Sequence, residues 1–380
     1  MSTVLIIGSS GFIAGKLALR LQKEGKIGSS EIKELILADT SPPPPNLITK
    51  ACSSGAAAVT ATALDLTKME DVQYTIRELK PHVIFHLAAI VSGDAEANFE
   101  LGYHVNVDGM RNVLESIRLI GDEYKPRLVF SSSLAVYGPP LPKDGIVKDS
   151  HAVTPRGSYG TQKHMAELLL EDYSRKGYVD GMTIRFPTIA IRPGKPNKAA
   201  SSFISGIIRE PLNGEASPLP VPRTFCHPIA SPQKAVEYLM QAAALTPQQP
   251  GDRTLNVPSI SVSIQEMLDA MARVVEDDDD KDDILELVQD KPDPFIANIV
   301  QQWPQTFACE RATELGFAPD PSYDAIIQSY IRDELGGKVP PRTKNDKGDG
   351  NHPTQDEPDG AVPPTTKKRK VSGGVNQMEE

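Results

Sequence analysis

A glycine-rich turn lies near the N-terminus, between a short apolar run and a helix-length stretch. The run Val4–Ile7 is followed by Gly8-Ser9-Ser10-Gly11-Phe12-Ile13-Ala14-Gly15. Gly8 can take the positive φ of a sharp turn, and Gly11 lets the backbone come close to a pyrophosphate. The helix that comes next directs unpaired N–H groups and its positive dipole end at that phosphate. The turn predicts a dinucleotide site at Gly8, Ser10, Gly11, Phe12 and Ile13.

Strand-like and helix-like segments alternate after this turn. The apolar runs are Val4–Ile7, Leu35–Ala38, Val83–Ala88 and Arg127–Ser131, and the helix-length stretches are Phe12–Glu24, Phe99–Leu119 and Met165–Ser174. Strands that are apolar on both faces are typical of a buried parallel sheet. The alternation predicts an α/β fold of the Rossmann type, with a doubly wound parallel sheet.

The composition changes along the chain and suggests three parts. Residues 1–187 are expected to form the NAD-binding domain that carries the catalytic residues. Residues 188–335 are rich in Pro and Gly and are expected to form a smaller α/β substrate-binding lobe, with some segments returning to the first domain. Residues 336–380 contain no aromatic residue and are expected to be a disordered tail.

Charge and cysteine content exclude several classes of protein. The 380 residues carry a formal net charge of −10, which disfavours binding to nucleic acid. No apolar run is long enough for a membrane helix, and the three cysteines match neither a disulfide framework nor a metal site. The chain is expected in the cytoplasm. The tail cluster Lys367-Lys368-Arg369-Lys370 is either a nuclear-import signal or a solvated charged segment.

Two aspartates come after strand-like runs on the expected adenosine side. Asp39 ends the second run, where a carboxylate can accept hydrogen bonds from both ribose hydroxyls and repel a 2′-phosphate. This favours NAD over NADP, although an acid can also simply end a strand. Asp65 comes after Val59–Leu64 and is interpreted either as a neighbour of the adenine or as the N-cap of a helix over Thr67–Leu79.

A tyrosine and a lysine lie four residues apart in Ser158-Tyr159-Gly160-Thr161-Gln162-Lys163, so they share one helix face. A free tyrosine titrates near pH 10. A cation about 4 Å away, at an effective dielectric of about 20, would lower that pKa by roughly three units. Tyr159 is therefore expected to act as a general base near neutral pH with the help of Lys163. Ser133 is expected to hold the same substrate oxygen, with Ser131 and Ser132 as alternatives.

In this order the motifs resemble the extended short-chain dehydrogenase/reductase superfamily, which includes the NAD-dependent epimerase/dehydratase family. The resemblance covers about residues 3–330. It implies an NAD-binding Rossmann fold, catalytic roles for Ser133, Tyr159 and Lys163, and a homodimer through the helices Phe99–Leu119 and Tyr159–Ser174. It also implies further cofactor contacts at Leu66, Ala88, Ser92, Tyr159, Lys163, Pro187 and Ile189.

Two segments, Leu87–Gly93 and Ile191–Leu212, look like those of the D-erythronate dehydrogenase group within that branch. This likeness implies NAD-linked oxidation of a four-carbon sugar acid at C2, with Arg192, Lys195 and Lys198 near the substrate. A small acid needs cations for its carboxylate, which agrees with these residues. The alternative is that they lie on an exposed loop.

Other functions stay open at this point. A nucleotide-sugar epimerase or dehydratase would use the same three catalytic residues with bound NAD, and Arg223 would then help to hold the substrate phosphates. His227 is either a substrate contact or a structural histidine. A third possibility is a redox sensor that binds partners, but sensors of this kind usually lack the pair Tyr159 and Lys163. The favoured function is an NAD-dependent dehydrogenase of a small sugar acid.

Overall fold

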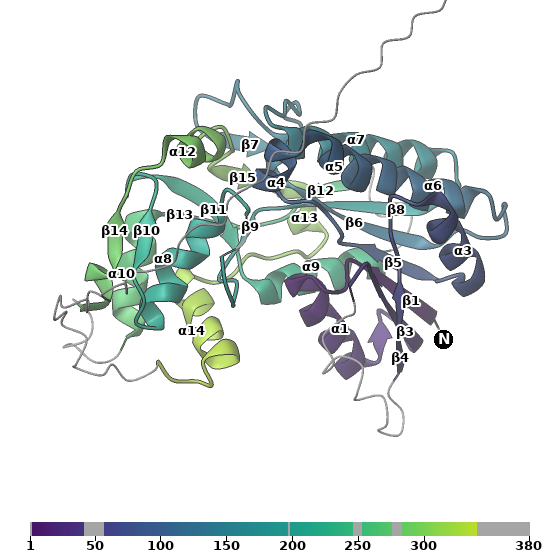
Figure 1. Ribbon diagram of the computed structural model, residues 1–380, viewed down its shortest axis with the longest axis horizontal. Coiled ribbons are helices and arrows are strands. Elements are labelled where there is room, and N and C mark those ends of the chain that lie inside the picture. The colour runs from purple at the N-terminus through teal and green to yellow at the C-terminus, as the bar shows by residue number, and fades with distance from the viewer. Residues whose placement is uncertain (1, 42–56, 197, 246–252, 276–282, 340–380) are drawn as a thin grey trace, which may run out of the picture. The chain divides into compact units, whose positions relative to one another are not determined.

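A parallel sheet forms the centre of the structure (Figure 1). The computed structural model describes residues 2–41, 57–196, 198–245, 253–275 and 283–339. The strand order is β12 (Thr254–Asn256), β8 (Asp180–Phe186), β6 (Arg127–Ser133), β5 (Val83–His86), β1 (Ser2–Ile7), β3 (Ser30–Asp39) and β2 (Lys26–Ile27), and β4 (Ala58–Ala63) also pairs with β3. Among the described strands of this sheet, only the short β2–β3 pair is antiparallel. The order of the strands reverses beside β1, because β3 lies on one side of it and β5 on the other.

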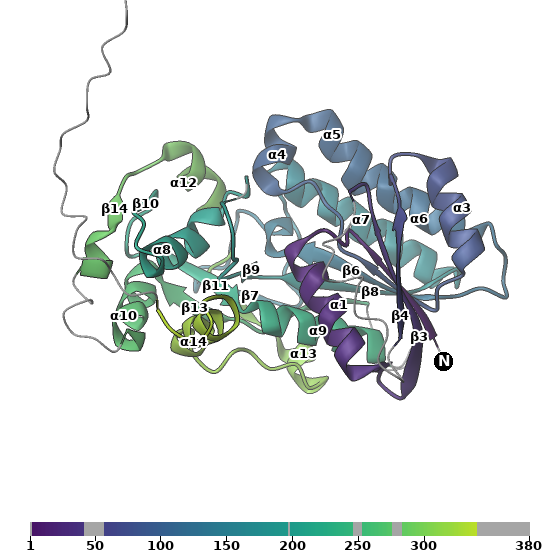
Figure 2. The ribbon, with the colours of Figure 1, turned by 60° about the horizontal axis from the view of Figure 1, so that its bottom comes forward.

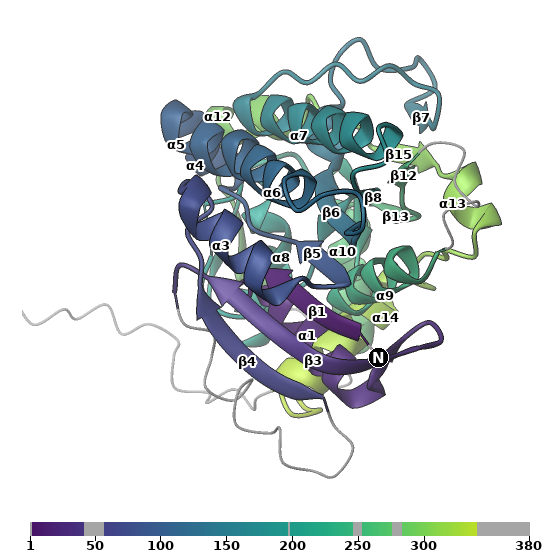
Figure 3. The ribbon, with the colours of Figure 1, turned by 90° about the vertical axis from the view of Figure 1, so that its right-hand side faces the viewer.

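Alternate residues of β1 face two different helix layers. Val4 and Ile6 pack in one core with α1 (Phe12–Glu24) and α9 (Pro232–Ala244). Leu5 and Ile7 pack in another core with α3 (Met69–Leu79), α6 (Gly109–Arg118) and α7 (Ser158–Arg175). Figure 1 shows these two helix layers on opposite sides of the sheet, and Figure 3 shows β1, β3 and β4 side by side. The predicted Rossmann-type fold is therefore confirmed.

The helix expected over Phe99–Leu119 is present and contains a π-helical turn. It is divided into α5 (Phe99–Tyr103), a π-helical turn over His104–Asp108, and α6. In that turn the Asn106 side chain accepts a hydrogen bond from the Ile90 amide at 2.8 Å and donates to the Ile90 carbonyl at 3.1 Å. The turn therefore fixes the loop that leaves β5.

Much of the chain after residue 187 builds a separate apolar core beside the sheet (Figure 2). Its strands are β9 (Thr188–Ile189), β10 (Ser217–Leu219), β11 (Cys226–Ala230), β13 (Ile260–Ser263) and β14 (Val288–Asp290), and its helices are α8 (Ser202–Leu212), α10 (Ile264–Val274), α12 (Pro294–Val300) and α14 (Tyr323–Glu334). The remaining elements are α4 (Ser92–Ala97), a 3₁₀ turn over Leu134–Val136, β7 (Ile146–Lys148), β15 (Thr306–Ala308) and α13 (Glu310–Glu314). In contrast, α9 and β12 belong to the main sheet and its covering helices. The assignment of NAD binding to residues 1–187 and of substrate binding to residues 188–335 stays a prediction.

Some sequence predictions fall outside the described residues. These are nearly all of the tail that begins at Gly336, including its basic cluster at Lys367–Lys370. Within the described part of the chain, no helix is long and apolar enough to span a membrane.

Candidate active site

The glycine turn after β1 has the geometry that a bound pyrophosphate requires. Gly8 has a φ of 87°, and a Cβ there would lie 2.5 Å from the Ala88 amide nitrogen. Gly11 is the N-cap of α1 and gives that helix no side-chain cap. Gly8, Gly11, Phe12 and Ile13 line a cavity of about 330 Å³, which we call the central cavity. The N-terminus of α1 therefore faces open space that suits a phosphate group.

A second cavity of about 280 Å³ is also lined by Gly8 and Gly11, and we call it the Asp39 cavity. The predicted cofactor residues Asp39, Asp65, Leu66 and Ala88 line it. Asp39 accepts a hydrogen bond from the Ser10 amide at 3.0 Å, which fixes its carboxylate beside the glycine turn. Ser10 is thus placed at the site through Asp39.

Asp65 has no capping role in α3, whose N-cap is Lys68. Its carboxylate instead accepts hydrogen bonds from the amide and hydroxyl of Thr67, at 3.0 and 2.7 Å. The Thr67 hydroxyl lowers the pKa of Asp65, which keeps it charged at the cavity wall. The N-cap interpretation is therefore wrong, because the helix begins four residues after Asp65.

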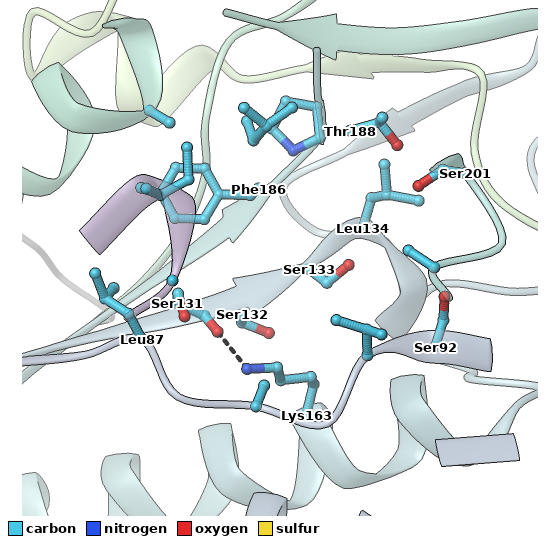
Figure 4. A pocket seen from close by; sticks show the side chains of 18 of the residues that line it. Leu87, Ser92, Ser131, Ser132, Ser133, Leu134, Lys163, Phe186, Thr188 and Ser201 are labelled. Carbon is cyan, nitrogen blue, oxygen red and sulfur yellow. Dashed lines mark hydrogen bonds between the residues drawn. The ribbon is translucent and has the colours of Figure 1, made fainter. Parts of the chain in front are cut away.

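The three serines at the end of β6 have different surroundings, because successive side chains of a strand point to opposite faces. The Ser131 carbonyl accepts a hydrogen bond from Lys163 Nζ at 2.7 Å. The Ser132 hydroxyl is buried and donates to Glu167. Ser133 acts to lower the pKa of Tyr159 and lines the central cavity with it. Figure 4 shows its hydroxyl at the open part of that cavity. Of the three alternatives, Ser133 is the one that acts on the pKa of Tyr159.

Tyr159 and Lys163 lie together on α7 and both line the central cavity. Lys163 Nζ lies 5.7 Å from the centre of the Tyr159 ring and 4.6 Å from that of Phe130. Burial lowers the pKa of Lys163 to about 7, against the opposing charge of Glu167. Burial also raises the pKa of Tyr159 to about 12, while Arg192 and the hydrogen bond with Ser133 act to lower it.

These surroundings add two features to the electrostatic prediction made from the sequence, which stays a prediction. That prediction required a fully charged Lys163 that lowers the pKa of Tyr159. Lys163 is only 2% exposed, so desolvation lowers its pKa and reduces the fraction of Lys163 that is charged. The cation that acts on Tyr159 is Arg192, from a loop far along the chain.

Arg192 lines the central cavity, and its charge acts on Tyr159. Its Nε donates to the Ile189 carbonyl at 3.1 Å, and its own carbonyl accepts from Arg209 at 2.6 Å. Among the described residues, no carboxylate forms an ion pair with Arg192. Burial lowers its pKa, and Tyr159 opposes that shift. The site therefore contains a cation whose bonding capacity is only partly used.

The other predicted substrate residues do not reach this cavity. Lys198 forms an ion pair with Asp94 at 3.0 Å, and Arg223 forms one with Asp290 at 3.3 Å. Lys195 is exposed and is not among the lining residues. In contrast, the predicted cofactor residues Ser92, Pro187 and Ile189 do line the central cavity.

Trp303, the single tryptophan of the chain, also lines the central cavity and was not predicted from the sequence. Thr188 and Ser201 line it as well (Figure 4). Thr188 is hydrogen-bonded to the buried His227 at 2.7 Å. His227 therefore supports a residue that lines the central cavity but does not line the cavity itself. No periodicity points to these residues. A lone tryptophan in a polar loop was the one signal that could have found Trp303.

A buried polar network supports the strand and helix that carry the site. Glu167, one turn after Lys163, binds the Arg185 guanidinium at 2.9 and 2.7 Å. Arg185 also donates to the Tyr137 hydroxyl at 2.7 Å. Burial alone would raise the pKa of Glu167, but hydrogen bonds from His164, Arg185 and Ser132 outweigh it and lower the pKa. The carboxylate is therefore charged and joins β6, α7 and β8.

We expect Glu167→Gln to lower the free energy of unfolding by about 3 kcal/mol, because it leaves Arg185 buried without its counter-charge. Chemical denaturation of the purified protein measures this change. Glu171→Gln is the matched control, since Glu171 is exposed one turn further along α7. Equal stability of the two variants would contradict the account of this network.

Comparison with known proteins agrees with this geometry. A family model for the NAD dependent epimerase/dehydratase family matches residues 4–227. The chain is 41% identical over 335 residues to the D-erythronate dehydrogenase of Cupriavidus necator, covering 87% of this chain and 98% of that protein. It is 40% identical to the D-erythronate dehydrogenase of Haemophilus influenzae, covering 87% and 99%.

A solved structure from Agrobacterium tumefaciens, described as a nucleoside-diphosphate-sugar epimerase, is 42% identical to the chain. The TM-score is 0.81, and the match covers 89% of this chain and 96% of that one. The glycine turn, the two cavities that meet at it and the group of Ser133, Tyr159 and Lys163 agree with these likenesses. This chain belongs to the NAD dependent epimerase/dehydratase family.

Proposed function

We propose that this protein is a dehydrogenase that oxidises D-erythronate at C2, with NAD as the hydride acceptor. The observation that carries the proposal is Arg192, which lines the same cavity as Ser133 and Tyr159 and whose charge acts on Tyr159. A planar guanidinium binds a carboxylate through two parallel hydrogen bonds. The two named relatives at 40 and 41% identity support the choice of acid. Formation of NADH from NAD and D-erythronate tests it.

The residues present fit NAD. The turn at Gly8 and Gly11 would hold the pyrophosphate, Asp39 the adenosine ribose, and Lys163 the nicotinamide ribose. Bound NAD supplies the acceptor for a hydride from C2. Phe186, Pro187 and Ile189 wall the central cavity on the side where β8 ends, so they would set the position of the nicotinamide.

In the proposed mechanism, Arg192 orients the substrate through its carboxylate. Ser133 donates a hydrogen bond to the C2 oxygen, and Tyr159 accepts the hydroxyl proton as general base. Ser133 and Tyr159 line the same cavity, so both groups can reach one substrate oxygen. Because the substrate is held by its carboxylate and by its C2 oxygen, the reacting carbon has a defined orientation.

We expect the rate of oxidation to rise with pH from 7 to 9. Tyr159 must be deprotonated to accept a proton, and its pKa is raised to about 12. Below that pKa, the deprotonated fraction increases about tenfold per pH unit, so kcat/KM should increase by up to that factor. Lys163 becomes neutral above about pH 7 but keeps N–H donors for Ser131. A rate that falls over this pH range would contradict the role of Tyr159.

We propose that Asp39 selects NAD over NADP. Its carboxylate lines the Asp39 cavity and is fixed by the Ser10 amide. Asp39→Ala removes a negative charge that would repel a 2′-phosphate, so the ratio of kcat/KM for NAD to that for NADP should fall about tenfold or more. Steady-state rates with each cofactor measure this ratio. An unchanged ratio would mean that Asp39 is the last residue of β3 and has no influence on the choice of cofactor.

The second candidate is a nucleotide-sugar epimerase, the activity named for the similar Agrobacterium structure. Such a substrate needs cations for two phosphates. Arg223, the residue expected to meet them, instead pairs with Asp290 and does not line the central cavity. This favours the sugar acid.

We further propose a cytoplasmic homodimer. The exposed apolar side chains Phe99, Leu101, Met165 and Leu168 lie on α5 and α7, the helices expected to pair. Burial of such side chains favours association. Cys226 and Cys309 are free thiols, which agrees with a reducing compartment.

A further inference from the structure

We propose that a third cavity binds the hydroxyl-bearing tail of the substrate and selects its chain length. We call it the Gln302 cavity. It has a volume of about 210 Å³ and is lined by Glu96, Asn298, Gln302, Ile299, Tyr137 and Arg156, among others. It shares Ser92, Tyr159 and Trp303 with the central cavity, so the two meet beside the proposed general base. This inference rests on the proposed function.

The direction of the tail is set by the tetrahedral geometry of C2. The proposed mechanism assigns three of the four substituents of C2: the oxygen to Ser133 and Tyr159, the carboxylate to Arg192, and the hydrogen to the nicotinamide site beside Pro187 and Ile189. These side chains line the central cavity, and of them only Tyr159 also borders the Gln302 cavity. The fourth substituent, C3, must point away from the cofactor wall. The Gln302 cavity adjoins the central cavity at Ser92, Tyr159 and Trp303, and neither Pro187 nor Ile189 lines it.

The lining of the Gln302 cavity suits hydroxyl groups. A hydroxyl both donates and accepts, and side-chain amides and carboxylates supply the matching partners. Asn298 and Gln302 are four residues apart, at the end of α12, and the Gln302 amide donates to the Asn298 carbonyl at 2.7 Å. Glu96 is held in place from α4 because it accepts a hydrogen bond from the Ser158 amide at 2.9 Å. Trp303 and Ile299 supply apolar surface for the C–H groups of the tail.

The cavity therefore distinguishes acids by the atoms they carry beyond C2. D-glycerate shares the carboxylate and the C2 hydroxyl with D-erythronate but is one carbon shorter. D-glycerate also has a C3 hydroxyl but has no C4, so loss of a hydrogen bond to the C4 hydroxyl should affect D-erythronate alone. One hydrogen bond of about 1.4 kcal/mol corresponds to a tenfold change.

The test compares Gln302→Ala with Gln301→Ala. Gln301 is the matched control, because it is an exposed neighbour that does not line the cavity. We expect Gln302→Ala to lower kcat/KM for D-erythronate about tenfold and to leave D-glycerate unchanged, as a substrate or as a competitive inhibitor. Asn298→Trp, which fills the cavity, should lower the value for D-erythronate more strongly with the same selectivity. Gln301→Ala should change neither.

Binding provides a readout without turnover. Trp303 is the only tryptophan and borders both cavities, so its fluorescence should respond to acids bound there. Titrations in a Tyr159→Phe background with NAD should give a dissociation constant for D-erythronate that Gln302→Ala raises about tenfold. Equal effects on both acids, or no effect on either, would overturn the inference. If the unaltered protein oxidises no sugar acid, the proposed function itself fails instead.

Discussion

Tyr159→Phe is expected to lower kcat for D-erythronate by about 10³-fold, which is within the usual range for loss of a general base. The substitution removes one hydroxyl and leaves a ring of nearly the same shape at the wall of the central cavity. The proton of the C2 hydroxyl then has no acceptor, since Ser133 is a donor to the same oxygen. Steady-state kinetics measure the loss.

Binding of NAD by the Tyr159→Phe variant should be almost unchanged, because the glycine turn and Asp39 lie on other elements. Calorimetric titration with NAD is the control for this. A variant that retains full turnover would contradict the proposed mechanism. A variant that loses turnover and NAD binding together would show that Tyr159 supports the fold or the cofactor rather than the proton transfer.

Arg192→Gln is expected to lower kcat/KM for D-erythronate by about 10²- to 10³-fold. Removing one partner of a buried, hydrogen-bonded charge pair costs about 2–5 kcal/mol, and the substrate carboxylate would lose both its counter-charge and its orientation. Because Arg192 also acts to lower the pKa of Tyr159, its loss should move the rise of the pH–rate profile toward higher pH.

Lys195→Gln is the matched control for Arg192→Gln. It removes one positive charge from the same loop, but Lys195 is exposed and does not line the central cavity. We expect less than a twofold change in kcat/KM, since an exposed charge contributes little. A large loss with Lys195→Gln and none with Arg192→Gln would place the carboxylate outside the central cavity and contradict the proposed orientation of the substrate.

Local signals were enough to predict the sheet and the glycine turn. The helix predicted over Phe12–Glu24 coincides with α1, because Gly11 and Gly25 mark its two ends. Each of the apolar runs named in the sequence contributes to a strand of the main sheet, since strands buried on both faces need apolar residues at every position. The candidate catalytic residues Ser133, Tyr159 and Lys163 could also be predicted from the sequence, because all three lie in short motifs.

The rest depended on contacts between distant segments. Arg192, Lys195 and Lys198 are all basic residues of one loop, so the sequence does not distinguish them. The path of the backbone after β9 places Arg192 at the central cavity and places Lys198 in an ion pair with Asp94. Trp303 reaches the site from a loop after α12, more than a hundred residues beyond Tyr159.

Desolvation is another property that spacing cannot show. The sequence places Lys163 on the same helix face as Tyr159. It does not show that Lys163 is buried and therefore partly deprotonated at neutral pH. The sequence likewise gives no indication that Glu167 opposes this effect from one turn away. The π-helical turn at Asn106 is similar, because it is stabilised by hydrogen bonds to Ile90 in another segment.

The central claim is that the protein transfers a hydride from D-erythronate to NAD. Absorbance of NADH should rise when purified protein is mixed with NAD and D-erythronate, and the initial rate should saturate with the acid. Nucleotide sugars should produce no net NADH. No rise with D-erythronate or with any other four- to six-carbon sugar acid, together with interconversion of a nucleotide sugar, would contradict the claim and establish the epimerase instead.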